Sequence, residues 1–192
     1  MSSAPNDFGR DHGLIHEVVV TGSKAGWDRE DWAKLTHDVD FMRQIREVRL
    51  GRASIVAAEH VIDCDADPFL PTGWRVKEHQ KGGKLTWDPC RVQLYLSQKQ
   101  RNGEVRGSKV CEELGERPKY NANVLDHLLA HPHLIPAFWA NRYVCFWGTE
   151  YRDQDHVGCV RCLCWSGGRP IWRGLPIDYA WNGSIYAALH VG

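Results

Sequence analysis

The hydrophobic pattern changes along the chain, and this change constrains the fold more than any other feature. In residues 39–48 apolar side chains recur at helical spacing, and Gly51 follows as a typical helix end. Asp28 precedes an acidic first turn and is typical of a helix N-cap. We therefore expect a small helical segment of two or three helices in residues 1–54.

After residue 54 the pattern is that of short strands with two helices between them. Residues 91–97 alternate apolar and polar side chains, as a half-buried strand does. Two helices are expected in the segments SKVCEELGE and NANVLDHLLAH, and further strands at 142–151, 157–165 and 185–191. Helices followed by short strands predict an α+β fold with an antiparallel sheet. Residues 55–192 are the expected second domain.

Charge balance and the lack of long apolar runs exclude several classes of protein. The chain has 24 basic and 24 acidic side chains, whereas a nucleic-acid surface needs clustered Lys and Arg. Residues 1–13 lack the apolar core of a signal peptide, and no run of about 18 apolar residues exists to span a bilayer. We expect no nucleic-acid partner, no membrane span and a cytoplasmic location, with surface display by an unrecognised route left open.

Seven cysteines raise the question of a disulfide, redox or zinc role. Their number is odd and no export signal is visible, so reduced thiols are expected. Cys159 and Cys162 form a Cys-x-x-Cys pair, but strand-like alternation around them would direct the two side chains to opposite faces. No second pair has zinc-ligand spacing. Buried strand cysteines are the prediction, with no cofactor.

One pair of histidines has the spacing of a chelating pair. His127 and His131 are four residues apart in an expected helix and so share one face. A zinc-protease motif would place Glu directly after the first histidine, where Leu128 stands. The prediction is a solvated helix face, and no metal ligand is assigned.

The segment 165–181, WSGGRPIWRGLPIDYAW, is rich in tryptophan and lacks the period of a helix or a plain strand. Residues 155–192 contain no Lys, Glu, Gln or Met, whereas residues 1–154 contain 8 Lys, 10 Glu, 6 Gln and 2 Met, a frequency that predicts about six here. Randomising the adenines of Asn codons produces this gap, because such codons cannot become Lys, Glu, Gln, Met or Trp. Trp172 and Trp181 would then be fixed positions between varied runs.

The ordered set ELGERPKYNANVLDHLL, FWGTEY and IYAALHV resembles the C-terminal part of the variable proteins of diversity-generating retroelements, found in uncultivated archaea and small-genome bacteria. It is also similar to the broader C-type lectin fold. The resemblance covers roughly residues 55–192 and implies a C-type lectin-like domain with short antiparallel strands and two helices. It further implies a ligand-binding surface whose side chains are exchanged by mutagenic retrohoming, within a variable region at about 164–185.

The expected ligand-binding residues lie in short runs around Trp172 and Trp181, and an adenine-mutated Asn codon can encode each of them. They are Arg173, Gly174, Leu175, Asp178, Tyr179, Ala180, Asn182, Gly183, Ser184 and Ile185. The expected partner is a protein or cell-surface ligand that differs among sister copies. No catalytic residue is assigned, and the chain is not expected to be an enzyme.

Two other functions stay open. An enzyme on a scaffold related to the cysteine-to-formylglycine oxidase would need a reactive cysteine pair, for which Cys159 and Cys162 are the candidates. An adaptor for nucleic acid or protein could use the basic residues of the N-terminal helix, although neighbouring acids dilute their charge. These basic residues are Arg43, Arg46, Arg49 and Arg52.

Overall fold

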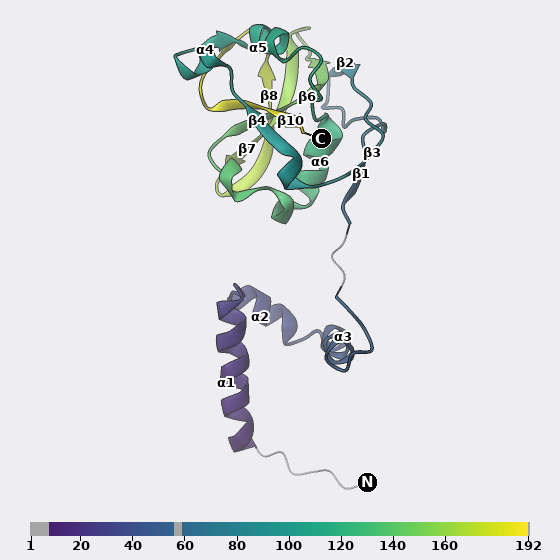
Figure 1. The fold of residues 1–192 in the computed structure, drawn as a ribbon, viewed down its shortest axis with the longest axis vertical. Coiled ribbons are helices and arrows are strands. Elements are labelled where there is room, and N and C mark those ends of the chain that lie inside the picture. The colour runs from purple at the N-terminus through teal and green to yellow at the C-terminus, as the bar shows by residue number, and fades with distance from the viewer. Residues whose placement is uncertain (1–7, 56–58, 192) are drawn as a thin grey trace. The chain divides into compact units, whose positions relative to one another are not determined.

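The chain divides into two compact units, Met1–Ala58 and Glu59–Gly192. The computed structural model describes residues 8–55 and 59–191 (Figure 1). The expected domain boundary, between residues 54 and 55, lies just before this division. The two units are described separately below.

The N-terminal unit consists of three helices, α1 (Phe8–Lys24), α2 (Arg29–Leu35) and α3 (Val39–Arg49). This confirms the helices expected from the sequence. At the start of α2 the Asp28 carboxylate accepts from the backbone N–H of Asp31 at 2.9 Å, and the Asp31 carboxylate accepts from the N–H of Asp28 at 3.0 Å. This reciprocal capping box satisfies N–H groups that the helix itself cannot pair.

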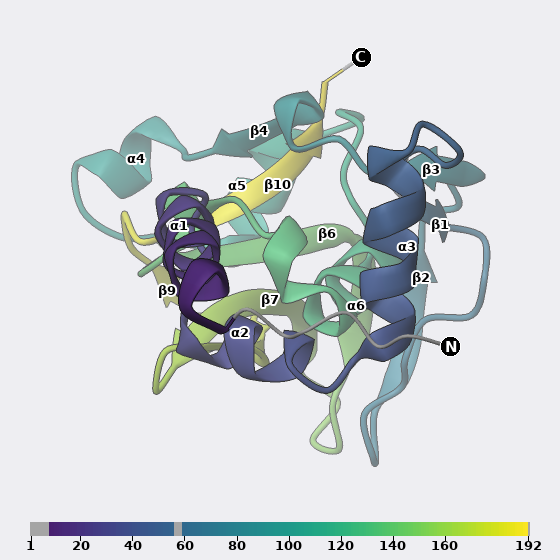
Figure 2. The same ribbon diagram turned by 90° about the horizontal axis from the view of Figure 1, so that it is seen from below.

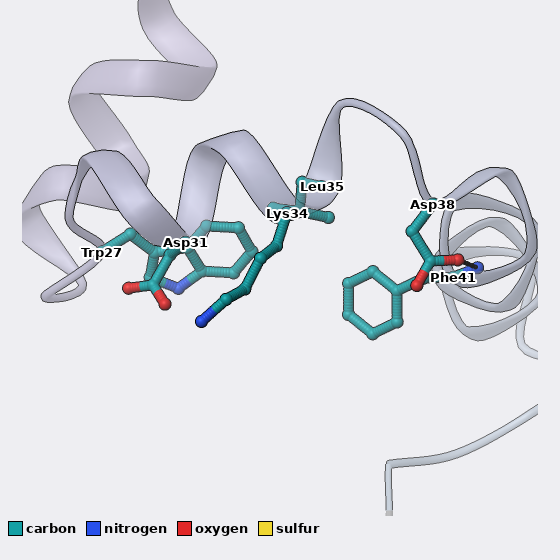
Figure 3. Close-up of a pocket in the computed structure, with 6 residues that line it drawn as sticks. All are labelled: Trp27, Asp31, Lys34, Leu35, Asp38 and Phe41. Atoms are coloured by element: carbon teal, nitrogen blue, oxygen red, sulfur yellow. Dashed lines mark hydrogen bonds between the residues drawn. The ribbon is translucent and has the colours of Figure 1, made fainter.

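The helices of this unit keep their apolar side chains largely in solvent. Neither α2 nor α3 has a buried residue among those described. The exposed apolar side chains of α1 and α3 include Leu14, Ile15, Val18, Val39, Met42 and Ile45. An open hollow of about 370 Å³ lies along α2 and the start of α3, with Trp27 and Lys34 on one side and Phe41 on the other (Figure 3).

The C-terminal unit is built on a six-stranded sheet with the order β4-β10-β6-β7-β8, and β2 pairs with the far end of β6. The strands are β2 (Arg75–His79), β4 (Val92–Tyr95), β6 (Tyr143–Arg152), β7 (Gly158–Ser166), β8 (Arg169–Pro176) and β10 (Ile185–His190). Two small ladders join β1 (Val61–Asp63) to β3 (Lys84–Thr86) and β5 (Val105–Arg106) to β9 (Ala180–Trp181).

One ladder departs from the expected antiparallel sheet. Strand β10 runs parallel to β6, with Ile185 opposite Tyr143, whereas the other ladders of the described residues are antiparallel. Parallel neighbours need a long crossover connection, and β7, β8 and β9 supply it between β6 and β10. The fold is therefore mixed α and β with mainly antiparallel pairing.

The two expected helices of this unit are α5 (Gly107–Leu114) and α6 (Ala122–Ala130). A one-turn helix, α4 (Gln98–Arg101), and three 3-10 turns (Pro89–Arg91, Pro132–Leu134 and Ala137–Trp139) complete the described elements. Across residues 8–55 and 59–191, no helix combines the length and the apolar character that crossing a bilayer requires.

Two helices cover opposite faces of the sheet. On β6, Val144 and Phe146 belong to the apolar cluster that includes the buried side of α6, while Cys145 and Trp147 belong to the cluster that includes the buried side of α5. Alternation along a strand separates these two sets. Figure 2 shows the sheet and α6 from a second direction. Because β6 and β7 are buried on both faces, the sequence of each strand is a nearly continuous run of apolar residues.

Cys145 and Cys162 form a disulfide between β6 and β7. The expectation of seven reduced thiols is therefore wrong for this pair. The two residues lie directly opposite each other in the antiparallel ladder, where side chains come close enough to bond. Cys159, three residues before Cys162 on the same strand, points to the other face, as its spacing predicts.

The tryptophan-rich segment is more regular than its sequence suggests. Gly167 and Gly168 have φ values of +56° and +77° and form a two-residue hairpin turn. Strand β8 then pairs with β7 from Arg169 to Pro176 without interruption. Because β8 is an edge strand, its two prolines remove no hydrogen bond from the sheet interior.

Candidate ligand-binding surface

The ten expected ligand-binding residues lie on β8, on the turn between β8 and β9, at the start of β9, on the loop from β9 to β10 and at the start of β10. Seven of them are exposed: Arg173, Asp178, Tyr179, Ala180, Asn182, Gly183 and Ser184. Tyr179 is the most prominent apolar group, with 67% of its surface accessible. The exposed positions thus form two short runs, 178–180 and 182–184, on either side of the buried Trp181, with Arg173 separate on β8.

The other three residues point toward the scaffold. Leu175 and Ile185 are partly buried and pack against the cluster beneath α5. Gly174 faces Trp74, and a Cβ atom at position 174 would lie 2.2 Å from the ring of that tryptophan. A side chain therefore fits at position 174 only when the Trp74 ring moves. The sequence did not reveal this restriction because Trp74 lies a hundred positions earlier.

The loop between β9 and β10 is held by a residue outside it. Gln100, only 2% exposed, donates from Nε2 to the carbonyl oxygens of Asn182 at 3.1 Å and Ile185 at 2.8 Å. The N–H of Ser97 donates to Gln100 Oε1 at 3.0 Å and orients the amide. The path of residues 182–185 is thus fixed from α4.

The turn between β8 and β9 is held from α5 and by Trp181. The backbone N–H of Ser108 donates to the carbonyl of Ile177 at 2.8 Å, and that of Gly107 donates to the carbonyl of Tyr179 at 3.1 Å. Trp181, 2% exposed, donates from Nε1 to the carbonyl of Pro176 at 3.0 Å. These bonds involve no side chain of the exposed residues.

Position 107 has to be glycine for this arrangement. A Cβ atom there would lie 2.7 Å from the Trp181 ring and 2.8 Å from the carbonyl oxygen of Ile177. The Trp181 ring also packs on Trp147, with ring centroids 5.1 Å apart. The close approach of α5 to the turn therefore depends on residues that face away from solvent.

Among the exposed residues, Asn182 has a structural role of its own. Its Oδ1 accepts from the backbone N–H of Ser184 at 3.0 Å and from the Ser184 hydroxyl at 2.6 Å. This is a local turn of the kind that Asn favours. Position 182 is therefore less free than Asp178 or Tyr179, for which no such side-chain bond is found within residues 59–191.

Trp172 anchors the inner face of β8. Its ring stacks on the guanidinium of Arg161 at 4.6 Å, and the ring of Phe69 lies 4.9 Å from the same group. Arg161 is 1% exposed and makes two hydrogen bonds to the Asp126 carboxylate on α6, at 2.6 and 3.0 Å. The sequence pointed to Trp172 as a fixed position but did not reveal this buried ion pair.

A hollow of about 430 Å³ lies beside the exposed turn. Asp178 and Ile177 line it together with Lys77, Cys111 and Glu150. Lys77 donates to Glu150 at 2.6 Å, and this bond raises the pKa of Lys77. The exposed stretch is therefore bordered by a concave, charged surface rather than by a flat one.

Two buried free cysteines of this unit, Cys159 and Cys64, do not have the character of nucleophiles. Burial, followed by the nearby Asp153 carboxylate, raises the pKa of the Cys159 thiol to about 11. Burial likewise raises the pKa of Cys64 to about 11. A reactive thiol has a lowered pKa instead. Cys162, the other member of the Cys-x-x-Cys pair, is in the disulfide with Cys145.

Three histidines converge at the start of β1 and the end of α6. His60, His127 and His131 are each partly buried and could hold a metal ion. Burial, followed by the charges of His131 and His60, lowers the pKa of His127. The expected solvated pair, His127 and His131, is therefore part of a larger cluster. His60 went unrecognised because it lies far away in the sequence.

The basic residues of α3 and of the turn after it are mostly paired with acids. Arg43 lies 2.6 Å from Asp40, and Arg52 lies 2.7 Å from Glu47. Arg46 also contacts Glu47, at 3.4 Å. These pairs neutralise much of the charge that an adaptor surface would need.

Comparisons of the chain with protein-family models, with curated proteins and with solved structures give no match.

Proposed function

We propose that this protein is a non-enzymatic binding protein whose C-terminal surface is diversified by an adenine-directed retroelement. One observation carries the proposal: the backbone of residues 176–185 is held by Gln100, Trp181 and the start of α5, while Asp178, Tyr179 and Ser184 face solvent. Side chains on such a stretch can be exchanged with little effect on the fold, because surface substitutions usually change stability by less than about 0.5 kcal/mol.

The order of elements supports a C-type lectin-like domain. Helix α6 precedes the FWGT strand β6, the hairpin β7–β8 follows, and the last strand β10 returns to the centre of the sheet. This is the order that the resemblance implies. The resemblance implies a ligand surface built from strands and loops, and the exposed residues lie on β8, on β9 and on the loops that follow these strands.

Around Trp172 and Trp181, the residue types and their exposure to solvent support the same proposal. The exposed side chains all belong to the set that a mutated Asn codon can encode, whereas Trp172 and Trp181, which it cannot encode, pack against the scaffold. Tyr179 and Arg173 are residue types that anchor protein interfaces. We therefore propose a protein or cell-surface ligand that differs among sister copies.

Two observations favour this function over the alternatives. An oxidase related to the formylglycine-forming enzymes would use a reactive pair at Cys159 and Cys162, but Cys162 is bonded to Cys145 and the pKa of Cys159 is raised. An adaptor role for α3 is disfavoured because Arg43 and Arg46 of this helix, and Arg52 just after it, pair with acids of the same unit.

Sequencing the DNA on both sides of the gene tests the proposal. We expect a near-copy of the segment encoding residues 164–192, with Asn codons at the exposed positions, beside a reverse-transcriptase frame. Mismatches between the two copies should be confined to adenines of the near-copy. Flanks without such a copy, or mismatches spread over all four bases, would contradict the proposal.

A further inference from the structure

The His60, His127 and His131 cluster brings together two elements that are distant in sequence. His60 immediately precedes β1, and His127 and His131 lie at the end of α6. The nitrogen atoms that could act as ligands, one from each side chain, all lie within 4.8 Å of one another. Three partly buried imidazoles so close together are a set that divalent transition metals favour.

The spacing of the nitrogens suits a tetrahedral ion. His127 Nε2 and His60 Nδ1 are 3.3 Å apart. Zn–N bonds of about 2.0–2.1 Å in a tetrahedral site place two ligand nitrogens about 3.3–3.4 Å apart. His60 and His127 therefore already have the required separation, and the ligand nitrogen of His131 lies within 4.8 Å of both.

The surrounding bonds orient the ligands as a metal site requires. His131 Nδ1 lies 3.0 Å from the carbonyl oxygen of His127. Since a carbonyl only accepts, Nδ1 carries the proton and Nε2 keeps its lone pair for a metal. Such a bond to the second ring nitrogen is the usual support of a metal-bound histidine. The backbone of His60 is fixed as well, because its carbonyl accepts from the N–H of Trp87 at 2.8 Å.

We propose that His60, His127 and His131 bind one divalent transition-metal ion of the zinc class, with the fourth coordination position open to solvent. The neighbouring His133 is exposed and is not one of the three residues whose nitrogens converge. Its ring lies 5.7 Å from that of His60, centroid to centroid. We therefore assign His133 no place in the first coordination sphere. This site is independent of the proposed ligand-binding surface.

Calorimetric titration of the full chain with Zn²⁺ tests the site. After treatment with a chelator, the wild-type protein should bind one equivalent and its melting temperature should rise, because an ion that binds only the folded state stabilises it. His127→Gln and His131→Gln should each weaken binding by more than about 100-fold, since loss of a supporting residue alone weakens metal sites by about 10–100-fold.

Two histidines serve as matched controls. His133→Gln, beside the cluster, and His37→Gln, in the N-terminal unit, should change the affinity by less than about threefold. Equal weakening by a control, or a wild-type protein that binds no more tightly than His131→Gln, would overturn the proposal. If His127→Gln does not fold, as shown by metal-free melting, His60→Gln decides the question, because His60 lies at the edge of the domain on a different element.

The visible spectrum of the Co²⁺-loaded protein gives a second readout that depends on the coordination itself. A band of the intensity typical of tetrahedral nitrogen coordination should appear in the wild type and in His133→Gln. The same band should be absent in His60→Gln and His131→Gln. Its absence in the wild type would contradict the tetrahedral site.

Discussion

The backbones of the two units are held in place in two different ways. In Met1–Ala58 the helices α2 and α3 are held by caps such as Asp28 and Asp38, and their apolar side chains stay in solvent. In Glu59–Gly192 a loop backbone is held by a residue far away in the sequence, as Gln100 holds the carbonyl of Ile185, and side chains of distant elements also pair, as Arg161 does with Asp126. Local bonds make a helix, but only long-range contacts make a cooperative core.

The largest fall in the free energy of unfolding is expected when the ion pair between Arg161 and Asp126 in the C-terminal unit is broken. Asp126→Ala leaves the Arg161 guanidinium buried without its partner, and we expect the free energy of unfolding to fall by about 3–5 kcal/mol. Asp155→Ala, at an exposed acid on the β6–β7 hairpin, is the control and should change it by less than about 0.5 kcal/mol. Urea unfolding followed by tryptophan fluorescence measures both. Equal effects would mean that the ion pair contributes nothing.

A smaller effect is expected at Gly174, one of the positions proposed to vary, where it meets the scaffold. Gly174→Leu forces the Trp74 ring aside, and overpacking of this kind costs about 1–3 kcal/mol. At the neighbouring exposed residue, Arg173→Leu should change the free energy of unfolding by less than about 0.5 kcal/mol. In the Trp74→Ala background the cost of Gly174→Leu should largely disappear. A double-mutant cycle by thermal unfolding checks this, and a coupling near zero would show that Trp74 is not the restraint.

Removing the N-cap of α2 should destabilise only the start of that helix. Asp28→Ala removes the side chain that accepts from Glu30 and Asp31, which typically costs about 1 kcal/mol of helix stability. Hydrogen exchange at these two amides should therefore speed up by about fivefold, while the melting of residues 59–192 stays unchanged. A shift of the main melting transition would contradict the division into two independent units.

The smallest effect is expected on the exposed stretch. Asp178→Ser, Tyr179→Ser and Ala180→Ser combined should change the free energy of unfolding by less than about 1 kcal/mol, because the backbone there is held by other residues. Gln100→Ala is the contrasting variant: it leaves the buried carbonyls of Asn182 and Ile185 unpaired and should cost about 1–3 kcal/mol. If the triple variant were the less stable of the two, the exposed side chains would be part of the scaffold.

Hydrophobic periodicity predicted the secondary structure well, because the pattern of a helix or a half-buried strand lies within a few consecutive residues of the sequence. The helices around Val39–Arg49 and Ala122–Ala130 and the strand at Val92–Tyr95 lie where the spacing placed them. The hairpin at Gly167 was missed because prolines interrupt its apolar pattern. An edge strand tolerates them, but position within a sheet is not a local property.

The candidate site was predictable in outline and not in detail. Composition marked the run near Tyr179, which is exposed in the structure; under the proposed function, exchange would leave such a trace in the residue types. Pairing across the fold leaves no such trace. The disulfide of Cys145 with Cys162, the approach of Trp74 to Gly174, and the third histidine all depend on strand register and helix packing. Each joins residues that only the folded chain brings together.

The position of Gln100 has a consequence for inheritance. The residue that fixes the shape of the 182–185 loop is encoded about 80 codons upstream of the loop itself. Under the proposed function, mutagenesis confined to the codons for about residues 164–185 never reaches the codon that maintains the loop's shape. New specificities would then arise in descendants without a matching rise in misfolded protein, because the information for shape and the information for recognition occupy separate stretches of DNA.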